Sequence, residues 1–440
     1  MTKRVLYIAY FYPPLGGAGV QRPLKTIKYL KEYGWNIDVL TVTNIQFHSY
    51  DHSLLSESQA DTIYRVQSFD VMSILQFFKN LCRQFKFGRK KEKIITKKNL
   101  RGVYFNTPES IKKIIRGSFP IDSKIGWYPF AYHKARQLFQ DKPYDLIFAT
   151  MSPYTSGVLA MHLSQKTNCP FFIDYRDHWT LLKYPYYNFR FLHRHAERKE
   201  KKMLQLAAGV FTTSKLMISD LKVKFGDFIQ DKSDFVYNGF DEIDFCPTPL
   251  SMKSPHIIIR YVGAFYGDRT VEHFINCLEI LHQKNLLPAN LHIEFIGNYY
   301  LEDMKLLTRT WLSSLITIIP QVPHSKAIEY IQTADLLLLF NPTNFGNEVI
   351  AGKLFEYIYA NRPILAMIPP QGEAAQILQK IGYEYICQME DENKIMEYLI
   401  HFFQNKHVYN YHGSQIEFVD SLSRKNQTQK IYQMITKKLG

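Results

Sequence analysis

The sequence predicts an α/β protein built from two doubly wound parallel sheets. Short apolar runs rich in β-branched residues alternate with longer helical patterns along almost the whole chain, as strand–helix–strand units do. Four Gly and Pro residues interrupt this alternation between Asn238 and Pro255. The chain has 440 residues, too many for one ordinary core, so we expect one sheet on each side of this linker.

Ten apolar runs are the expected strands of these sheets. In the first half they cover residues 4–10, 36–42, 145–149, 170–173 and 209–213, and in the second half 257–263, 291–297, 315–319, 335–340 and 363–367. A helical pattern over 20–33 follows the first run, and another closes the chain near 415–438. We therefore expect one Rossmann-like domain over residues 1–240 and a second over residues 256–412.

The net charge of +14 is concentrated in one short segment of the first domain. Between Lys79 and Arg101 there are ten Lys and Arg residues and one acid, Glu92, which gives a local charge of +9. Such a patch needs an anionic partner, which can be nucleic acid, an anionic membrane or a phosphorylated substrate.

The residues before this basic run have the pattern of an amphipathic helix. Apolar residues from Val71 to Phe85 recur at helical spacing, and polar residues occupy the other face. An amphipathic helix followed by a polybasic stretch is typical of interfacial membrane contact, which we assign to residues 71–101 of an insert at about 70–102. An ordinary core-facing helix with a solvated loop is the alternative.

Cysteines and hydropathy exclude several classes of protein. The five cysteines have neither metal-ligand nor redox spacing and their number is odd, as in reduced cytosolic proteins. No apolar stretch approaches about 18 residues, and the first one ends at Pro13-Pro14 without a small-residue cleavage site. We expect a cytoplasmic protein without a spanning helix.

Two candidate motifs belong to the first domain. The loop Pro13–Gly19 contains Gly16 and Gly17 and lies between the first strand and the first helix, where glycines let backbone amides approach an anion. It lacks the G-x-G-x-x-G pattern of dinucleotide sites, and a tight turn is its alternative interpretation. Polar residues also crowd directly after the strand 170–173: Asp174, Arg176, Asp177 and His178, followed by Trp179. There they can contact a substrate, with Trp179 stacking on a sugar, or an Asp–Arg pair can simply lock the loop.

The third motif carries the most chemistry. Glu348 and Glu356 are separated by seven residues, and Gly352-Lys353 opens an expected helix, so that Glu348 lies in the preceding loop and Glu356 one turn inside the helix. The amides of Val349, Ile350, Ala351, Gly352 and Lys353 then point towards one site. Such a helix start can hold a diphosphate, while two carboxylates accept hydrogen bonds from vicinal hydroxyls. A surface helix with two solvated acids is the alternative.

Together these motifs resemble glycosyltransferase family 4, whose members are retaining enzymes of the GT-B fold. The opening Tyr10-Phe11-Tyr12-Pro13-Pro14-Leu15-Gly16-Gly17 is similar to the family's acceptor-side glycine loop, and Glu348-x7-Glu356 to its nucleotide-sugar motif. The resemblance implies two Rossmann-like domains facing across a cleft. It also implies that a final helix, over 413–440, crosses back to the first domain.

The resemblance also implies roles for individual residues. Glu348 would contact donor-sugar hydroxyls, Glu356 the ribose, and the amides from Val349 to Gly352 the diphosphate. Arg269, in the loop that begins at Gly263, would neutralise leaving-group charge. The family's usual lysine after this arginine is replaced by Thr270-Val271-Glu272-His273, so Lys353 is the candidate second cation. Asp174, Asp177 or His178 would take the place of the family's His-Asp element.

The implied reaction is retaining transfer of a sugar from a nucleotide sugar to an acceptor hydroxyl, without a metal or another cofactor. The acceptor would be a saccharide or a lipid-linked saccharide of a cell-envelope polysaccharide, lipopolysaccharide or capsule pathway. The enzyme would work in the cytoplasm, peripherally on the inner face of the membrane.

Three other functions fit parts of the pattern. A nucleotide-sugar epimerase of the same architecture would need no acceptor. A non-catalytic binder of nucleic acid or another polyanion would explain the basic segment but leave both glutamates unused, so we expect no nucleic acid. A glycosidase could use Glu348 and Glu356 as its acid and nucleophile, but carboxylates beside a helix start suit diphosphate binding better.

Overall fold

The computed structural model describes residues 3–43, 45, 50–69, 114, 116–182, 187–246, 255–265, 268–299, 301–342, 344, 346–405 and 415–440. The chain divides into two compact units. Unit 1 comprises Met1–Thr213, Met217–Val236 and Thr428–Gly440, and unit 2 comprises Ser214–Leu216 and Tyr237–Gln427. The insert expected at about 70–102 lies outside the described residues.

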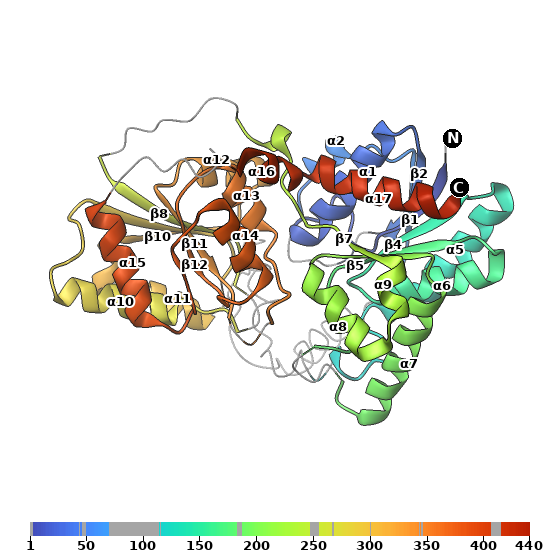
Figure 1. Cartoon of the computed structure of the whole chain (residues 1–440), viewed down its shortest axis with the longest axis horizontal. Coiled ribbons are helices and arrows are strands. Elements are labelled where there is room, and N and C mark those ends of the chain that lie inside the picture. Colours follow the sequence, from blue (N-terminus) through green and yellow to red (C-terminus); the bar gives the residue numbers. More distant parts are fainter. Residues whose placement is uncertain are drawn as a thin grey trace, which may run out of the picture. The chain divides into compact units, whose positions relative to one another are not determined.

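Unit 1 is a seven-stranded parallel sheet with helices on both faces (Figure 1). Its strands are β1 (Arg4–Ile8), β2 (Asn36–Val42), β3 (Thr62–Val66), β4 (Leu146–Thr150), β5 (Phe171–Tyr175), β6 (Gly209–Thr212) and β7 (Ser233–Phe235). Its helices are α1 (Ala18–Glu32), α2 (Leu54–Glu57), α5 (Tyr128–Asp141), α6 (Thr155–Thr167), α7 (Arg190–Leu206), α8 (Lys215–Phe225) and α9 (Phe228–Lys232), with the 3-10 turn η2 (Ile125–Trp127). The order β3-β2-β1-β4-β5-β6-β7 reverses direction between β1 and β4, as in doubly wound folds.

Unit 2 repeats this topology with six parallel strands in the order β10-β9-β8-β11-β12-β13. The strands are β8 (Ile257–Val262), β9 (Leu291–Ile296), β10 (Ile316–Ile319), β11 (Leu336–Phe340), β12 (Ile364–Met367) and β13 (Ile386–Cys387). The helices are α10 (Glu272–Gln283), α11 (Leu301–Leu307), α12 (His324–Gln332), α13 (Lys353–Tyr359), α14 (Glu373–Ile381), α15 (Glu392–Gln404) and α16 (Ile416–Ser421), with the turns η3 (Glu242–Asp244) and η4 (Thr310–Ser314). The predicted α/β class with two doubly wound parallel sheets is confirmed.

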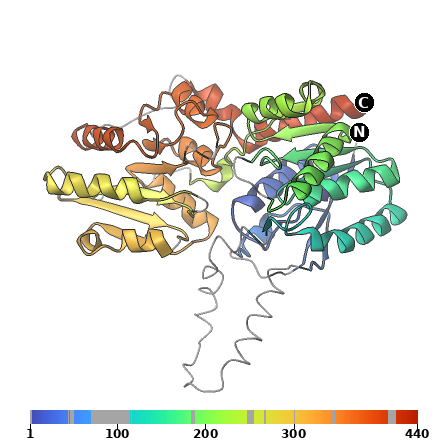
Figure 2. The same ribbon diagram turned by 90° about the horizontal axis from the view of Figure 1, so that it is seen from below.

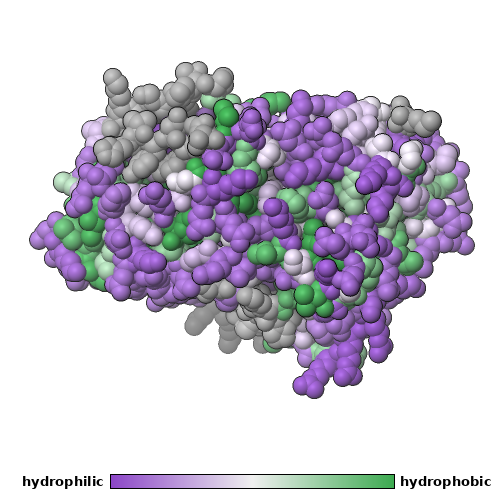
Figure 3. All heavy atoms as spheres, viewed as in Figure 1, coloured by the Kyte–Doolittle hydropathy of each residue, from purple (hydrophilic) through white to green (hydrophobic). Residues whose placement is uncertain are grey.

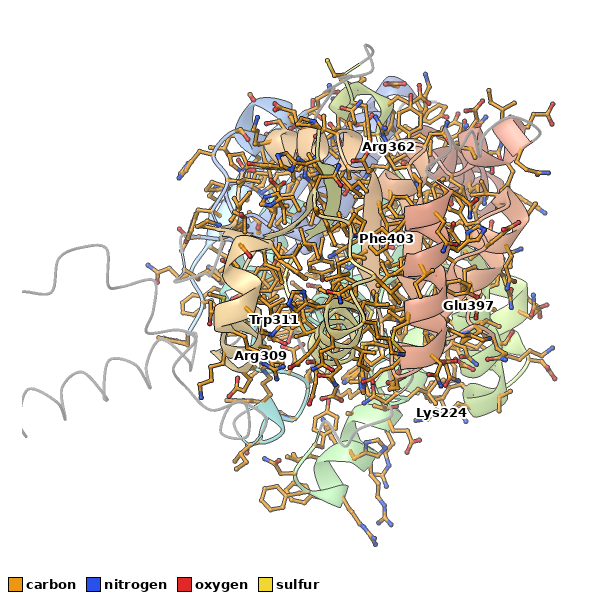
Figure 4. The ribbon with its side chains drawn as sticks, turned by 90° about the vertical axis from the view of Figure 1, so that its left-hand side faces the viewer. Lys224, Arg309, Trp311, Arg362, Glu397 and Phe403 are labelled. Carbon is orange, nitrogen blue, oxygen red and sulfur yellow. The ribbon has the colours of Figure 1, made fainter. Side chains whose placement is uncertain are left out.

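The strands are buried on both faces, which explains their uninterrupted apolar sequences. In β11 every residue from Leu336 to Phe340 is buried. Leu336, Leu338 and Phe340 join one core cluster with residues of α10, α11 and α15, and their neighbours along the strand face the opposite side. Figure 4 shows Glu397 and Phe403 on α15, and Arg309 and Trp311 next to each other at η4. These two side chains fasten η4 to α10, because Arg309 pairs with Glu279 at 2.9 Å and Trp311 stacks on His282.

The end of the chain contains two helices instead of the single one expected over 415–438. α16 ends at Ser421, and α17 (Arg424–Leu439) begins after the amide of Arg424 donates to the carbonyl of Phe240 at 2.7 Å. From Thr428 onwards α17 belongs to unit 1, where Ile431 and Ile435 enter the core. Among the described residues, none of the helices has the length and apolar character needed to cross a membrane.

Candidate functional site

The candidate site of unit 2 lies where its strand order reverses. β8 and β11 are neighbours in the sheet, and β9 and β12 extend it in opposite directions from them. Ligands of doubly wound sheets bind outside the carboxyl ends of the strands at such a point. The loop from Gly263 to Arg269 leaves β8 there, and the segment from Asn341 to Gly352 leaves β11. The topology therefore brings the predicted donor residues of unit 2 to one edge of one sheet.

Gly263 makes room for a lysine at this edge. Its φ is +142°, a conformation that L side chains rarely adopt. A Cβ at this position would overlap both Nζ and Cε of Lys353. The glycine is thus required twice, for the backbone turn after β8 and for the close approach of the ammonium group.

Lys353 is a buried cation without a hydrogen-bond partner among the described residues. Its Nζ lies 3.9 Å from the centroid of the Tyr261 ring, a cation–π contact. Burial lowers the pKa of Lys353 well below its ordinary value, the charge of Arg269 lowers it further, and Glu356 opposes the shift. Unsatisfied buried donors are rare in folded proteins and cost about 1–3 kcal/mol. This ammonium is therefore suited to an anionic ligand.

Arg269 supplies a second cation next to Lys353. The residue is 4% exposed, and its Nη2 donates to Oδ1 of Asn341 at 3.1 Å. Asn341 in turn donates from Nδ2 to the carbonyl of Val349 at 3.5 Å. Asn341, which directly follows β11, thus links the loop after β8 to the segment before α13. No sequence pattern pointed to Asn341, because its partners are 72 and 8 residues away.

Helix α13 places its site residues on one face. Lys353, Glu356 and Tyr357 are at positions i, i+3 and i+4, so they point in the same direction. The hydroxyl of Tyr357 accepts from the amide of Val262 at 3.0 Å, at the end of β8. This bond fixes α13 to β8 and thereby sets where Lys353 and Glu356 lie. α13 has only seven residues, so the side-chain cations carry more of the site's positive charge than its helix dipole does.

Glu356 forms an ion pair that the sequence analysis missed. Nε2 of His324, the first residue of α12, lies 3.0 Å from Oε1 of Glu356, and its Nδ1 lies 3.9 Å from Asp244. Burial raises the pKa of Glu356, but the hydrogen bond and charge of His324, with Arg424 and Lys353, outweigh it and leave the pKa low. Burial likewise lowers the pKa of His324, but Glu356 and Asp244 raise it above its ordinary value. Both groups are therefore held in their charged forms.

Glu348 lies in the segment before α13, as predicted. It is partly exposed, and its carboxylate folds back over Gly346. Gly346 has a φ of +104°, and a Cβ there would overlap the carboxylate oxygens. The carbonyls of Ala351 and Gly352 accept the first amides of α13, those of Leu354 and Phe355. Ile350 is buried and Val349 is partly exposed.

The glycine loop of unit 1 is tied to the loop after β5. Gly17 has a φ of +97° and directly precedes α1, and Gly16 before it in the chain is buried. The carbonyl of Gly19 accepts from Nη1 of Arg176 at 2.8 Å. The two segments predicted to contact the acceptor therefore lie together in unit 1.

Asp174 stabilises this part of unit 1 through buried hydrogen bonds. It is 1% exposed; Nε and Nη2 of Arg22 donate to it at 2.9 and 2.6 Å, and Thr150 donates at 2.9 Å. Arg22 also donates to the carbonyl of Val236 at 2.8 Å. Both carboxylate oxygens are thus used inside unit 1, so Asp174 acts as a positioning residue. The Asp–Arg lock considered from the sequence exists, with Arg22 as its arginine instead of Arg176.

His178 is paired with an acid that the sequence did not reveal. Its Nε2 lies 3.0 Å from Oδ2 of Asp220 on α8, 42 residues further along the chain. His178 is buried, whereas Asp177 beside it is exposed. Trp179 was expected to stack on a sugar, but it is fully buried, stacked on Tyr154 and bonded to Tyr187. That expectation was wrong because Trp179 completes the core of unit 1.

Buried Glu200 on α7 fixes the end of this loop. It accepts from the hydroxyls of Tyr175 and Thr180, and from the amide of Thr180 at 3.2 Å. Burial raises the pKa of Glu200, and these hydrogen bonds offset part of the shift. Lys224, marked in Figure 4, donates from Nζ to the hydroxyl of Thr180 at 2.8 Å. Asp177 and His178 are therefore presented by a loop that is anchored at both ends.

Comparison with known proteins shows what the chain is similar to. Residues 93–242 match the model of Glycosyltransferase Family 4, and no curated protein matches the chain in sequence. The structure is similar to that of HepE from Anabaena in complex with UDP and glucose. The TM-score is 0.65 at 13% identity, covering 99% of this chain and 100% of HepE. The chain is therefore similar to glycosyltransferase family 4 over residues 93–242, and it has the GT-B fold.

Two further structures share the fold of this chain. The lipopolysaccharide outer core galactosyltransferase WaaB has a TM-score of 0.54 at 12% identity, with 99% of both chains covered. The UDP-GlcNAc 2-epimerase from Neisseria meningitidis, bound to UDP-GlcNAc, has a TM-score of 0.55 at 12% identity. That match covers 99% of this chain and 100% of the epimerase. At such identities the structural similarity establishes only the fold, so the reaction has to be argued from the residues of the site.

Replacing Gly263 by Ala should destabilise the protein more than replacing Gly382 by Ala. Both glycines have positive φ values, +142° and +102°, so both variants gain backbone strain of about 1–3 kcal/mol. Gly382 has open space around it, whereas a Cβ at Gly263 meets Lys353. Urea unfolding would give the two losses. Equal losses would show that Lys353 moves away without cost.

The ion pair of His324 and Glu356 should stabilise the fold most strongly between about pH 4.5 and 6.5, the ordinary pKa values of the two groups. The low folded-state pKa of Glu356 gives stability that is present above its unfolded pKa and lost as the pH falls. The raised pKa of His324 gives stability that is present below its unfolded pKa and lost as the pH rises. The difference in unfolding free energy between the parent and Glu356→Gln should therefore have a maximum in this window. A difference that does not vary with pH would contradict the pairing.

Proposed function

We propose that the enzyme transfers a sugar from a nucleotide-sugar donor to an acceptor hydroxyl, with retention at the anomeric carbon and without a metal ion. The observation that carries this proposal is the buried ammonium of Lys353, held beside Arg269 where the strand order of unit 2 reverses. Two cations at this edge, with few acids to neutralise them, match the charge of a nucleoside diphosphate.

Different residues of the proposed donor site would bind different parts of the nucleotide sugar. Lys353 and Arg269 would bind the diphosphate, with the amides from Val349 to Gly352 as further donors. Glu356 would accept from the ribose hydroxyls, since His324 uses one of its oxygens and a carboxylate offers about four acceptor positions. Glu348, in the segment before α13, would accept from the sugar.

The reaction breaks the bond between the anomeric carbon and the diphosphate oxygen, which keeps the electron pair. The acceptor oxygen bonds to that carbon, and its proton leaves with the diphosphate. Negative charge therefore grows on the leaving group. Cations that are already in place stabilise such charge without reorganisation. Lys353 and Arg269 would do so, and this makes a divalent cation unnecessary.

We further propose that unit 1 binds the acceptor through Gly16, Gly17, Asp177 and His178. Asp220 would set the tautomer and orientation of the His178 ring. The acceptor would be a saccharide or lipid-linked saccharide of an envelope polysaccharide, lipopolysaccharide or capsule. The basic segment 71–101 would hold the enzyme peripherally on the inner face of the cytoplasmic membrane.

Epimerisation of the nucleotide sugar is the second candidate, because epimerases such as that of Neisseria meningitidis share the fold. An epimerase also binds a sugar nucleoside diphosphate, so Lys353 and Arg269 fit both reactions. The two functions differ in whether the diphosphate is released to an acceptor. Product analysis therefore separates them.

Incubation with a panel of nucleotide sugars, with and without a crude bacterial lipid fraction, tests the proposal. We expect nucleoside diphosphate release that increases with the lipid fraction, together with a sugar-bearing lipid whose anomeric configuration matches that of the donor. In Glu348→Ala turnover should fall more than diphosphate affinity, because its partner is the sugar. In Glu356→Gln affinity should fall by about 1–3 kcal/mol. An epimerised donor without diphosphate release would establish the epimerase instead.

Lys353→Met should change stability and binding in opposite directions. Removing a buried, unsatisfied ammonium should leave the free energy of unfolding unchanged or higher, because its desolvation cost disappears. Affinity for nucleoside diphosphate, measured by calorimetry, should fall by about 1.5–3 kcal/mol, as expected for a hydrogen bond to a charged group.

Lys380→Met is the matched control. Lys380 also lies over an aromatic ring of unit 2, with Nζ 3.7 Å from the centroid of Phe418, but it is exposed. This variant should retain diphosphate affinity. If Lys353→Met binds diphosphate as tightly as the parent does, the proposed donor site is wrong.

A further inference from the structure

Helix α7 has an outward face that is rich in positive charge. Its exposed Lys and Arg residues are Arg190, Arg194, Arg198, Lys201 and Lys202. Of its two acids, Glu200 is buried, and Glu197, whose side chain is 41% exposed and lies one turn from Arg194 and Lys201, pairs with Lys224 at 3.1 Å. In the space-filling view, hydrophilic side chains dominate the part of unit 1 that contains α7 (Figure 3). This face, termed the α7 cationic face, therefore has a strong net positive charge, because five exposed cations border one partly exposed acid.

Two phenylalanines are exposed at the start of the α7 cationic face. Phe189 directly precedes the helix and is 54% exposed, and Phe191 in its first turn is 67% exposed. Their rings stack with centroids 5.6 Å apart. By helical spacing Phe191 points in the same direction as Arg194, Arg198 and Lys202. Large apolar side chains exposed together, next to cations, mark an interaction surface.

We propose that the α7 cationic face docks on an anionic membrane surface, with Phe189 and Phe191 inserted at the interface. Cations that face lipid phosphates, beside aromatic rings that enter the boundary of the acyl chains, are the two components of interfacial helix binding. The helix has 17 residues and is therefore about 25 Å long, so it can contact several lipid headgroups at once. α5, α6 and α7 lie side by side on unit 1, with α6 between the other two (Figures 1 and 2).

A membrane explains this face better than a nucleic acid does. Single-stranded nucleic acids stack their bases on aromatic rings, but Phe189 and Phe191 stack on each other with centroids 5.6 Å apart, so no base fits between the two rings. A purely ionic partner would leave both rings in water. The proposed function already includes a membrane contact through the segment 71–101, and the inference adds a second contact surface to it. It also rests on residues other than the segment 71–101.

Co-sedimentation with phosphatidylcholine vesicles, with and without phosphatidylglycerol, tests the inference. The variant with Arg194→Gln, Arg198→Gln, Lys201→Gln and Lys202→Gln should bind the anionic vesicles at least about tenfold more weakly than the parent, since each cation contributes to attraction. The control removes four exposed cations elsewhere on unit 1, through Arg136→Gln, Lys142→Gln, Lys166→Gln and Lys437→Gln. It should bind nearly as the parent does.

The phenylalanines should provide the part of the binding that salt does not remove. Phe189→Ser with Phe191→Ser should abolish binding to anionic vesicles at high salt, whereas Val223→Ser, at a position 90% exposed on α8, should not. All substituted residues are exposed, so unfolding midpoints should match the parent. Donor hydrolysis should also persist in every variant, which separates a failure of docking from a failure of the proposed function.

Three outcomes would overturn the inference. If the α7 variant binds as the parent does, another segment such as 71–101 holds the membrane. If the α7 and control variants lose equal affinity, overall charge is responsible and not this face. If the parent binds a homopolymeric RNA more tightly than anionic vesicles, the α7 cationic face is a nucleic-acid surface.

Discussion

The proposed donor site depends on one constraint, the burial of the Lys353 ammonium against the Tyr261 ring with no hydrogen-bond acceptor in the described structure. This arrangement requires a glycine at 263, since any Cβ there would displace the ammonium. It also requires α13 to stay fixed, which the bond between Tyr357 and the amide of Val262 ensures. The fold thus maintains an unfavourable charge at the point where a ligand would satisfy it. Unfavourable free energy of this kind is typical of functional sites.

The two units show how one topology supports different chemistry. In both, a cation lies near the strands where the order reverses. In unit 1 that cation is Arg22, and Asp174 and the carbonyl of Val236 satisfy it from inside the unit. In unit 2 the corresponding charge is Lys353, with Glu356 as a partial counter-charge that His324 already engages. The first arrangement stabilises a loop, whereas the second leaves binding capacity for an anion.

The sequence predicted the central strands well and the edges poorly. All ten predicted strands exist within two residues of their expected bounds, because strands buried on both faces are continuous apolar runs. It missed the outer strands β3, β7 and β13; β3 and β7 are only partly buried, and β13 has two residues. Local patterns found Lys353, Glu348 and Glu356. Asn341, His324 and Asp220 escaped because tertiary contacts, and not spacing, bring them to the site.

The His324–Glu356 pair explains how a buried carboxylate can remain a strong acceptor. Burial alone would favour protonated Glu356, and a protonated acid loses acceptor capacity. The charge on His324 reverses this preference, and Asp244 on its other side helps to keep the imidazolium charged. The same charge on Glu356 only partly offsets the cost of protonating Lys353, whose pKa remains low. A bound diphosphate would supply the missing negative charge, so ligand binding and protonation of Lys353 should favour each other. The positive charge of the cluster is therefore fully compensated only when an anion is bound.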